Sequence, residues 1–168
     1  LNCPRTSSAG RLFEAVAGIL GLCAGQSFEG QAAMLLESRL KDAASDSSYD
    51  LEIRTGRPMV LDWQPLIENI LVDLEQGIPP DVISLRFHNA LAQAALKVAQ
   101  AIGDKHIVLS GGCFQNKYLS ESLITKLQKS DFSVFPHRNL PPNDGCISAG
   151  QVVAVSLQSG SRPQRAGK

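Results

Sequence analysis

The sequence predicts an α/β domain with more helix than strand. Apolar residues recur at helical spacing along most of the 168-residue chain. Two short β-favouring segments, at residues 107–110 and 132–135, are each followed by a helical pattern. Strands that alternate with helices in this way pair in parallel through right-handed crossovers. We therefore expect packed helices around a small, partly parallel sheet.

Helix boundaries follow from capping residues, prolines and glycines. Thr6, Ser7 or Ser8 can cap the first helix, and Gly21 and Gly25 end it. Asp81 is predicted to cap the longest helix, whose apolar stripe includes several alanines and implies close packing. The other helices are expected at Glu29–Asp42, Pro65–Gln76, Asp81–Ile102, Gln115–Lys129 and Ile147–Leu157. The expected stripe of the longest helix comprises Phe87, Leu91, Ala94, Val98 and Ile102.

The remaining segments complete a single expected domain over residues 1–157. Residues 44–50 are polar and loop-like. The segments 50–53 and 59–61 flank a turn at Gly56, which predicts a short hairpin. Residues 158–168 are rich in Ser, Gly and Arg, and we expect a flexible tail there.

Composition excludes several classes of function. Sixteen basic and sixteen acidic residues give a formal net charge of zero, so neither a nucleic-acid footprint nor a polybasic membrane patch is expected. No apolar run reaches the length of a membrane span, and no signal peptide is recognisable. The four cysteines form no Cys-x-x-Cys pair, which is typical of reduced thiols in the cytoplasm.

The strongest candidate site is the turn Ser110-Gly111-Gly112, which follows the strand at residues 107–110. Glycines at the end of a strand allow a phosphate or a flat ring to approach the main chain closely. The next helix would add the positive end of its dipole, which favours anions. The alternative is an ordinary tight turn between strand and helix.

Other candidates carry an equally plain structural alternative. Asn116 is placed to bond a nucleoside, or to cap the helix that follows it. Asp144 is an oxygen ligand for a metal that would also touch phosphates, or the cap of the last helix. Glu14 could accept hydrogen bonds from ribose hydroxyls, or be solvated. Gly30 repeats the bare-backbone pattern more weakly.

The three histidines show no metal-ligand spacing. We expect His88 on a helix surface and His106 at the start of a strand, while His137 is a candidate auxiliary base. The chain shows no Ser-His-Asp set, reactive Cys-His pair or Walker-type loop, so a covalent nucleophile has no support in the sequence.

Four motifs follow one another along the chain: TSSAGRLFEAV at residues 6–16, FEGQAA at 28–33, VLSGGCFQN at 108–116 and PPNDG at 141–145. In this order they resemble the C-terminal part of the HypF-type carbamoyltransferases of nickel–iron hydrogenase maturation. As a set they are specific and cover residues 6–151. A more distant similarity extends to the enzymes that form threonylcarbamoyladenosine and to antibiotic O-carbamoyltransferases.

The resemblance implies one lobe of an actin/Hsp70-like (ribonuclease H-like) ATPase fold. It implies that ATP and carbamoyl phosphate give carbamoyl adenylate, whose carbamoyl group passes to the C-terminal cysteine of HypE. It also implies residue roles: Asp144 would hold a divalent metal, and Asn116 would fix the nucleoside. The adenosine side would be lined by Gly10, Glu14 and Gly30, and the base or phosphates would be cradled by Ser110, Gly111 and Gly112.

No residues of this chain match the family's His-x-x-x-His metal motif, so the remaining ligands are expected in a preceding lobe. We therefore expect half a site, an inactive isolated lobe, and exposed apolar surface that favours a homodimer. Two alternatives are a lobe of a sugar- or acetate-kinase-like phosphotransferase and a non-catalytic module that docks a partner. Release of ADP instead of AMP would identify the kinase, and partner binding without nucleotide affinity would identify the module.

Overall fold

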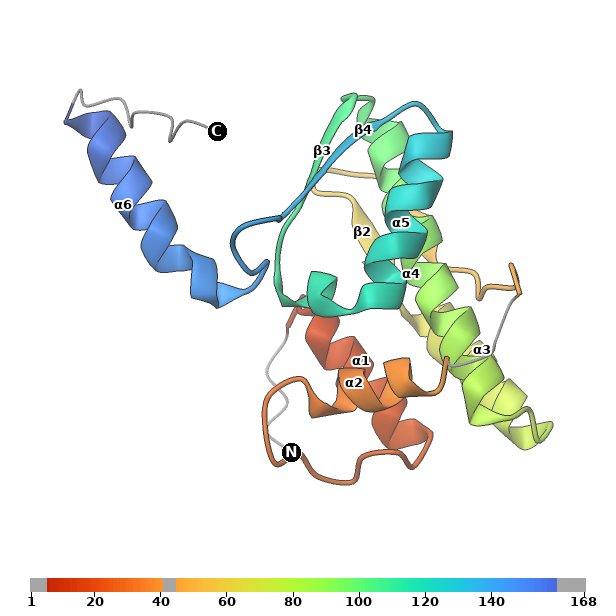
Figure 1. Cartoon of the computed structure of the whole chain (residues 1–168). Coiled ribbons are helices and arrows are strands. Elements are labelled where there is room, and N and C mark those ends of the chain that lie inside the picture. Colours follow the sequence, from red (N-terminus) through yellow and green to blue (C-terminus); the bar gives the residue numbers. More distant parts are fainter. Residues whose placement is uncertain (1–5, 41–44, 160–168) are drawn as a thin grey trace.

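The computed structural model describes residues 6–40 and 45–159 (Figure 1). Helices dominate, as predicted, but the strands form two separate two-stranded sheets in place of the single small sheet that was expected. In chain order the elements are α1 (Ala9–Ile19), α2 (Gln31–Ser38), β1 (Glu52–Arg54), β2 (Val60–Asp62), α3 (Gln64–Glu75), α4 (Pro80–Ile102), β3 (His106–Leu109), η1 (Gly112–Gln115), α5 (Lys117–Lys129), β4 (Ser133–Pro136), η2 (Asp144–Cys146) and α6 (Ile147–Gln158).

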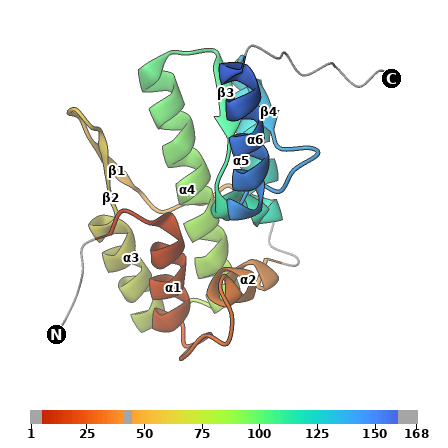
Figure 2. The same ribbon diagram turned by 90° about the vertical axis from the view of Figure 1, so that its left-hand side faces the viewer.

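The long helix α4 is the centre of the core. The helices α2, α3 and α5 and the strand β1 all pack against it (Figures 1 and 2). A helix that is apolar on most of its faces is buried by neighbours on several sides. The close packing expected from the alanines Ala90, Ala94 and Ala95 is confirmed at the first two, which are buried, whereas Ala95 is half-buried. Ile102, at the end of the expected stripe, is 64% exposed. The buried residues of α4 are Ile83, Ser84, Leu85, Phe87, His88, Asn89, Ala90, Ala92, Ala94, Leu96 and Ala99.

Several helix starts differ from the predictions, and the starts of α4 and α2 have clear physical reasons. Asp81 does not cap α4: Pro79 occupies the N-cap position, and Asp81 lies in the first turn. Pro80 suits the first helical position because its missing N–H needs no partner there, and the Asp81 carboxylate still interacts favourably with the helix dipole. The helix α2 begins two residues later than expected because Gly30, at φ 83°, turns the chain first. The predicted end at Asp42 lies outside the described residues.

The segment 45–51 is held on the core by buried polar bonds. The hydroxyl of Tyr49 donates to the Asp73 carboxylate at 2.5 Å, and the Arg86 guanidinium donates to the same oxygen at 2.6 Å. Burial and the neighbouring Asp73 carboxylate raise the pKa of Tyr49 above its usual value. The side chain of Asn89 donates to two carbonyls of the segment at 2.9 Å. These bonds join the loop to α3 and α4.

The predicted parallel pair is confirmed, with His106 opposite Ser133 and Leu109 opposite Pro136. The predicted hairpin is confirmed as the antiparallel pair β1 and β2. One face of the β3–β4 pair carries the buried Leu109, whereas Val108 and Phe135 are 69% and 52% exposed. Parallel sheets are normally covered on both faces, so this sheet has one unpartnered face.

The last helix, α6, stands apart from the other helices and strands (Figure 1). It contains no charged residue, and none of its side chains is buried. Val152, Val155 and Leu157 are each more than 60% exposed. An uncharged helix with exposed apolar side chains on every face is typical of a helix that packs against a partner surface.

Two further observations bear on the predicted organisation. Across residues 6–40 and 45–159, no helix is both long and apolar enough to cross a membrane. The helix α6 continues to Gln158, one residue beyond its predicted end, and residues 160–168 of the expected tail lie outside the described part of the chain.

Candidate functional site

The loops that follow β3 and β4 meet at the C-terminal ends of the parallel strands. The backbone N–H of Gly111 donates to the carbonyl of Pro142 at 2.6 Å. The side chains of Ser110 and His137 approach to 3.1 Å between Oγ and Nε2. Ligands of open α/β sheets bind at this edge. The structure thus brings together two segments that the sequence marks separately, residues 110–116 and 141–145.

The structure explains why glycine, and no larger residue, stands at positions 111 and 145 of this site. Gly111 has φ 110° and ψ 155°, a backbone region open almost only to glycine. A Cβ added at Gly111 or Gly112 would have no heavy atom within 4 Å, so the main chain there faces open space. At Gly145, by contrast, a Cβ would lie 3.1 Å from Asn143 and from Pro141. The first pair leaves room for a ligand, and Gly145 allows its own loop to close tightly.

Asn116 holds the turn in place. Its Oδ1 accepts from the backbone N–H of Leu119 at 2.8 Å, which caps α5. Its Nδ2 donates to Nε2 of His88 at 2.9 Å. The side chain is buried, with 6% exposed. The capping interpretation of Asn116 is confirmed, and the expected nucleoside contact stays a prediction that would rely on the remaining N–H of the amide.

The N-terminus of α5 is closed by the protein's own groups. Oε1 of Glu37, on α2, accepts from the backbone N–H groups of Lys117 and Tyr118 at 2.7 and 3.1 Å. Asn116 takes the N–H of Leu119. A carboxylate at this position satisfies the same donors and dipole that would attract a phosphate. The glycine turn, and not the start of α5, is therefore the part of this segment that faces a ligand.

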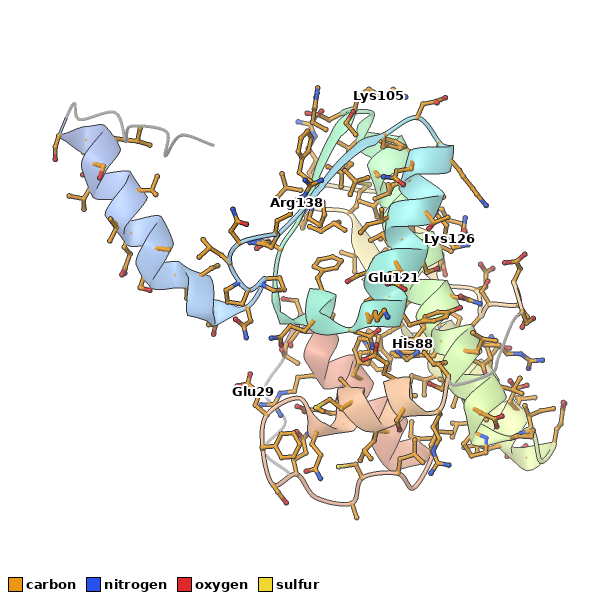
Figure 3. The ribbon with its side chains drawn as sticks, viewed as in Figure 1. Glu29, His88, Lys105, Glu121, Lys126 and Arg138 are labelled. Atoms are coloured by element: carbon orange, nitrogen blue, oxygen red, sulfur yellow. The ribbon has the colours of Figure 1, made fainter. Side chains whose placement is uncertain are left out.

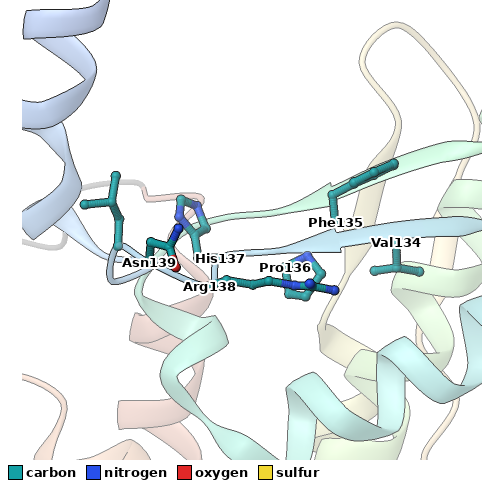
Figure 4. A pocket seen from close by; sticks show the side chains of 7 residues that line it. Val134, Phe135, Pro136, His137, Arg138 and Asn139 are labelled. Atoms are coloured by element: carbon teal, nitrogen blue, oxygen red, sulfur yellow. The ribbon is translucent and has the colours of Figure 1, made fainter. Parts of the chain in front are cut away.

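An open pocket of about 370 Å³ lies along the end of β4 (Figure 4). Residues 134–140 line it, with Phe135 and Arg138 exposed and His137 half-buried. Arg138 brings a cation to the strand end that also carries the bond between His137 and Ser110. His137 is thus positioned beside the glycine turn, and its role as a base stays a prediction.

The residues expected to line the adenosine side come from α1 and α2. The helix α1 packs against α2 and against η1, which places its first turns near the glycine loop. Gly10 lies in the first turn of α1 and is half-buried. Glu14 accepts a hydrogen bond from Arg11 at 2.8 Å, so its carboxylate is already paired at the surface. Gly30 adopts φ 83° at the N-cap of α2.

Asp144 does not cap the last helix, because the N-cap residue of α6 is Cys146 and no side chain caps that helix. Asn143 caps the preceding short helix η2, since its Oδ1 accepts from the N–H of Gly145 at 3.1 Å, and Asp144 is exposed in η2. Within the described ranges no group of three or more His, Cys, Asp or Glu side chains is arranged to hold a metal ion. Divalent metals need several ligands, so the role of Asp144 stays a prediction that requires ligands from elsewhere.

Sequence reasoning missed two residues of this region. His88 was expected on a helix surface, but it is fully buried between α5 and α2 (Figure 3). The scarcity of charge in α4 was the available signal, because such a helix leaves few exposed positions. Glu37 gave no signal, since a lone acid near the end of a helix is usually solvated, and its partners lie 80 residues further along the chain.

Comparison with protein families identifies the class. The family model described as "Carbamoyltransferase, Kae1-like Domain, second subdomain" matches residues 1–151. This chain belongs to that family. The carbamoyltransferase HypF of Synechocystis sp. is 41% identical over 154 residues, which cover 91% of this chain and 20% of the relative. The carbamoyltransferase HypF of Rhodobacter capsulatus is 38% identical over 95% of this chain and 21% of the relative.

Solved structures agree. Full-length HypF in a phosphate- and nucleotide-bound form matches with a TM-score of 0.85 and 41% identity, over 92% of this chain and 21% of that chain. The HypF of T. kodakarensis matches with a TM-score of 0.76 and 27% identity. The chain spans about a fifth of the length of these relatives. The HypF-type resemblance of the sequence is confirmed.

Proposed function

We propose that this chain is the second lobe of the ATP-binding domain of a HypF-type carbamoyltransferase. In this proposal the complete enzyme uses ATP and carbamoyl phosphate to form carbamoyl adenylate, and it passes the carbamoyl group to the C-terminal cysteine of HypE. The observation that carries it is the joined pair of loops, at which the bare backbone of Gly111 and Gly112 faces open space. The relative at 41% identity is described in a phosphate- and nucleotide-bound form.

The proposed contacts follow the geometry. The turn at Ser110, Gly111 and Gly112 would receive the base or phosphates, because no side chain blocks its main chain. Gly10, Glu14 and Gly30 would line the adenosine side, from α1, which packs against η1, and from α2, which packs against α1. ATP would thus lie between the loop after β3 and the start of α1. Asn116 would act chiefly by holding the turn, since most of its amide is engaged.

A divalent metal would hold the phosphates beside Asp144. The exposed Asp144 can supply one oxygen ligand from this chain, and the other ligands would come from a second lobe. When bound, the metal would supply positive charge that stabilises the phosphate groups. This chain's own contribution would be to aim one carboxylate and one glycine turn at the same space.

The proposed fold is half of an actin/Hsp70-like ATPase, completed by another lobe of the same protein. Two features support a missing partner surface: the exposed outer face of β3 and β4, and the uncharged α6 with no buried residue. Clamping a nucleotide between lobes excludes water and orients the reactants, which one lobe does not achieve alone. In isolation the same surfaces would favour a homodimer. We infer a cytoplasmic location, where ATP is available and thiols stay reduced.

The first experiment measures nucleotide binding by the 168-residue chain. We expect ATP to bind weakly and to shift the backbone amide signals of residues 110–116 in NMR spectra. The matched variant Gly111→Ala should lose this binding, because φ 110° strains any side chain. Gly150→Ala, in a helix with open space around the Cβ, serves as control. Shifts confined to regions far from residues 110–116 would contradict the assignment.

The second experiment tests the metal and the reaction in the complete enzyme. Asp144→Asn should lower carbamoyl-phosphate-dependent release of AMP and pyrophosphate by orders of magnitude, because a charged metal ligand is lost. Stability should hardly change, since Asp144 is exposed and Asn143 does the capping. Normal activity and metal content in this variant would exclude the metal role. Release of ADP would favour a kinase.

A further inference from the structure

A chain of three hydrogen bonds runs through the core from α4 to α5. Nδ1 of His88 lies 2.7 Å from the backbone carbonyl oxygen of Ser84. Nε2 of His88 lies 2.9 Å from Nδ2 of Asn116. Oδ1 of Asn116 accepts from the backbone N–H of Leu119 at 2.8 Å. This series of hydrogen bonds therefore ends at a backbone acceptor, the carbonyl of Ser84, on one side and at a backbone donor, the N–H of Leu119, on the other.

The two backbone ends fix the polarity of every group between them. A carbonyl oxygen only accepts, so Nδ1 of His88 carries the proton. A backbone N–H only donates, so the amide of Asn116 must present its oxygen to Leu119 and its nitrogen to His88. Nε2 of His88 must then accept. Only the neutral imidazole with its proton on Nδ1 satisfies all three bonds.

The surroundings of His88 favour the same neutral form. The rings of Phe13, Phe87 and Tyr118 approach it edge-on, with centroids 5.5 to 5.8 Å away. Burial lowers the pKa of His88, and the bond to Ser84 and the Glu37 carboxylate on α2 oppose that shift. Among the described residues, Glu37 and the phenol of Tyr118 are thus the titratable groups that face it from neighbouring elements.

Protonation of His88 would break this series of hydrogen bonds in either orientation of the Asn116 amide. In the present orientation, two donors would face each other at Nε2 and Nδ2. If the amide flipped, its nitrogen would face the N–H of Leu119, and the cap of α5 would be lost. Either outcome breaks one of the two hydrogen bonds that hold the side chain of Asn116, the residue that ends the segment beginning at Gly111.

We propose that His88 is a positioning residue for nucleotide binding: its unprotonated Nε2 fixes Asn116, and Asn116 fixes the glycine turn between β3 and α5. The inference rests on the proposed function, because the turn must bind the nucleotide for its position to affect affinity. His88 acts only through Asn116. Nucleotide affinity therefore depends on the protonation of a buried residue on a different helix.

The test is ATP binding by the 168-residue chain at pH 7.5 and 5.5, measured by titration calorimetry. His88→Leu removes the acceptor, and we expect about tenfold weaker binding at pH 7.5. His88→Gln keeps an acceptor near Nε2 without a titrating ring, so it should bind nearly as well as the original chain at pH 7.5. His106→Gln changes an exposed histidine at the start of β3 and is the control. Protonation of ATP itself affects all variants alike.

Between pH 7.5 and 5.5, the original chain and His106→Gln should lose more affinity than His88→Gln does. A direct readout accompanies the titration: ring ¹⁵N shifts should identify His88 as neutral with its proton on Nδ1, and the Leu119 amide signal should move as His88 titrates. Equal ATP affinity and equal pH dependence in all variants would overturn the inference and leave the proposed function intact. Absence of ATP binding to the original chain would overturn both, even if the Leu119 signal follows His88.

Discussion

The helices α4 and α6 are alike in sequence and opposite in environment. The first carries only three Asp, Lys or Arg residues in 23 positions, and the second carries none in 12. The core forms around α4, whereas none of the side chains of α6 is buried. Apolar composition therefore does not decide burial in this chain. The difference teaches that α4 is buried by neighbouring elements of the same chain, whereas α6 has no surface that buries it within residues 6–40 and 45–159.

The largest expected effect on stability comes from a substitution on α4. Phe87 is fully buried on α4, with its ring centroid 4.9 Å from that of Phe13. Phe87→Ala should lower the free energy of unfolding by about 3–5 kcal/mol, because it removes apolar contacts and leaves a cavity. Val155→Ala on α6 should change it by less than about 0.5 kcal/mol. Urea denaturation of both variants measures the difference, and similar losses would contradict the contrast.

A single substitution type can be compared on both helices. Ala94→Phe should cost about 1–3 kcal/mol through overpacking, because Ala94 is 2% exposed where other elements approach α4. Ala154→Phe on α6 meets no neighbouring core and should cost only the small difference in helix propensity. Both are measured as shifts of the denaturation midpoint. An unchanged midpoint for Ala94→Phe would refute close packing around α4.

Low pH should lower the free energy of unfolding through the buried His88 on α4. The pKa of His88 is lowered in the folded chain, so below pH 6.5 the unfolded chain binds more protons than the folded one. Stability from the neutral histidine is complete above the unfolded pKa and is lost as pH falls toward the folded pKa. One proton corresponds to about 1.4 kcal/mol per pH unit. His88→Gln should flatten this part of the pH profile in urea melts, and an unchanged slope would contradict it.

The smallest expected effect on stability is on the α6 side. Val152→Asp and Val155→Asp place charge on exposed apolar positions and should leave the unfolding free energy within about 0.5 kcal/mol. They should nevertheless reduce self-association of the isolated chain, which sedimentation velocity measures. Glu75→Asp, at an exposed position of α3, is a control that adds no charge. Unchanged association would show that α6 does not mediate it.

The elements that the sequence predicts well are those with local signals. Periodicity and proline marked α3 and α4, alternation with a turn at Gly56 marked the hairpin, and the β-favouring run before Ser110 marked β3. The site was predictable to the extent of its two loops, because glycines and an Asn-Asp-Gly sequence follow strands at one sheet edge. The burial of His88 was not predictable from the sequence, because it depends on four elements that meet only in the folded chain.

Alternatives that depend on one hydrogen bond also lay beyond the sequence. Asp144 and Asn143 are adjacent and both suit a cap, and only the backbone angles select Asn143. Likewise, the dipole of α5 predicts an anion, but a carboxylate from α2 supplies it. Local patterns thus identify what a position requires, whereas distant residues decide how the requirement is met.

The contact between Glu37 and the start of α5 has a consequence for the order of folding. The segment from β3 to β4 contains a strand, a turn, a helix and a second strand, and it would otherwise close on itself. However, the first N–H groups of α5 receive their partner from a residue 80 positions earlier. Closing a loop of that length costs entropy that local contacts do not repay. An excised fragment of residues 104–137 should therefore fray at the glycine turn, and the turn should be among the last parts of the chain to become ordered.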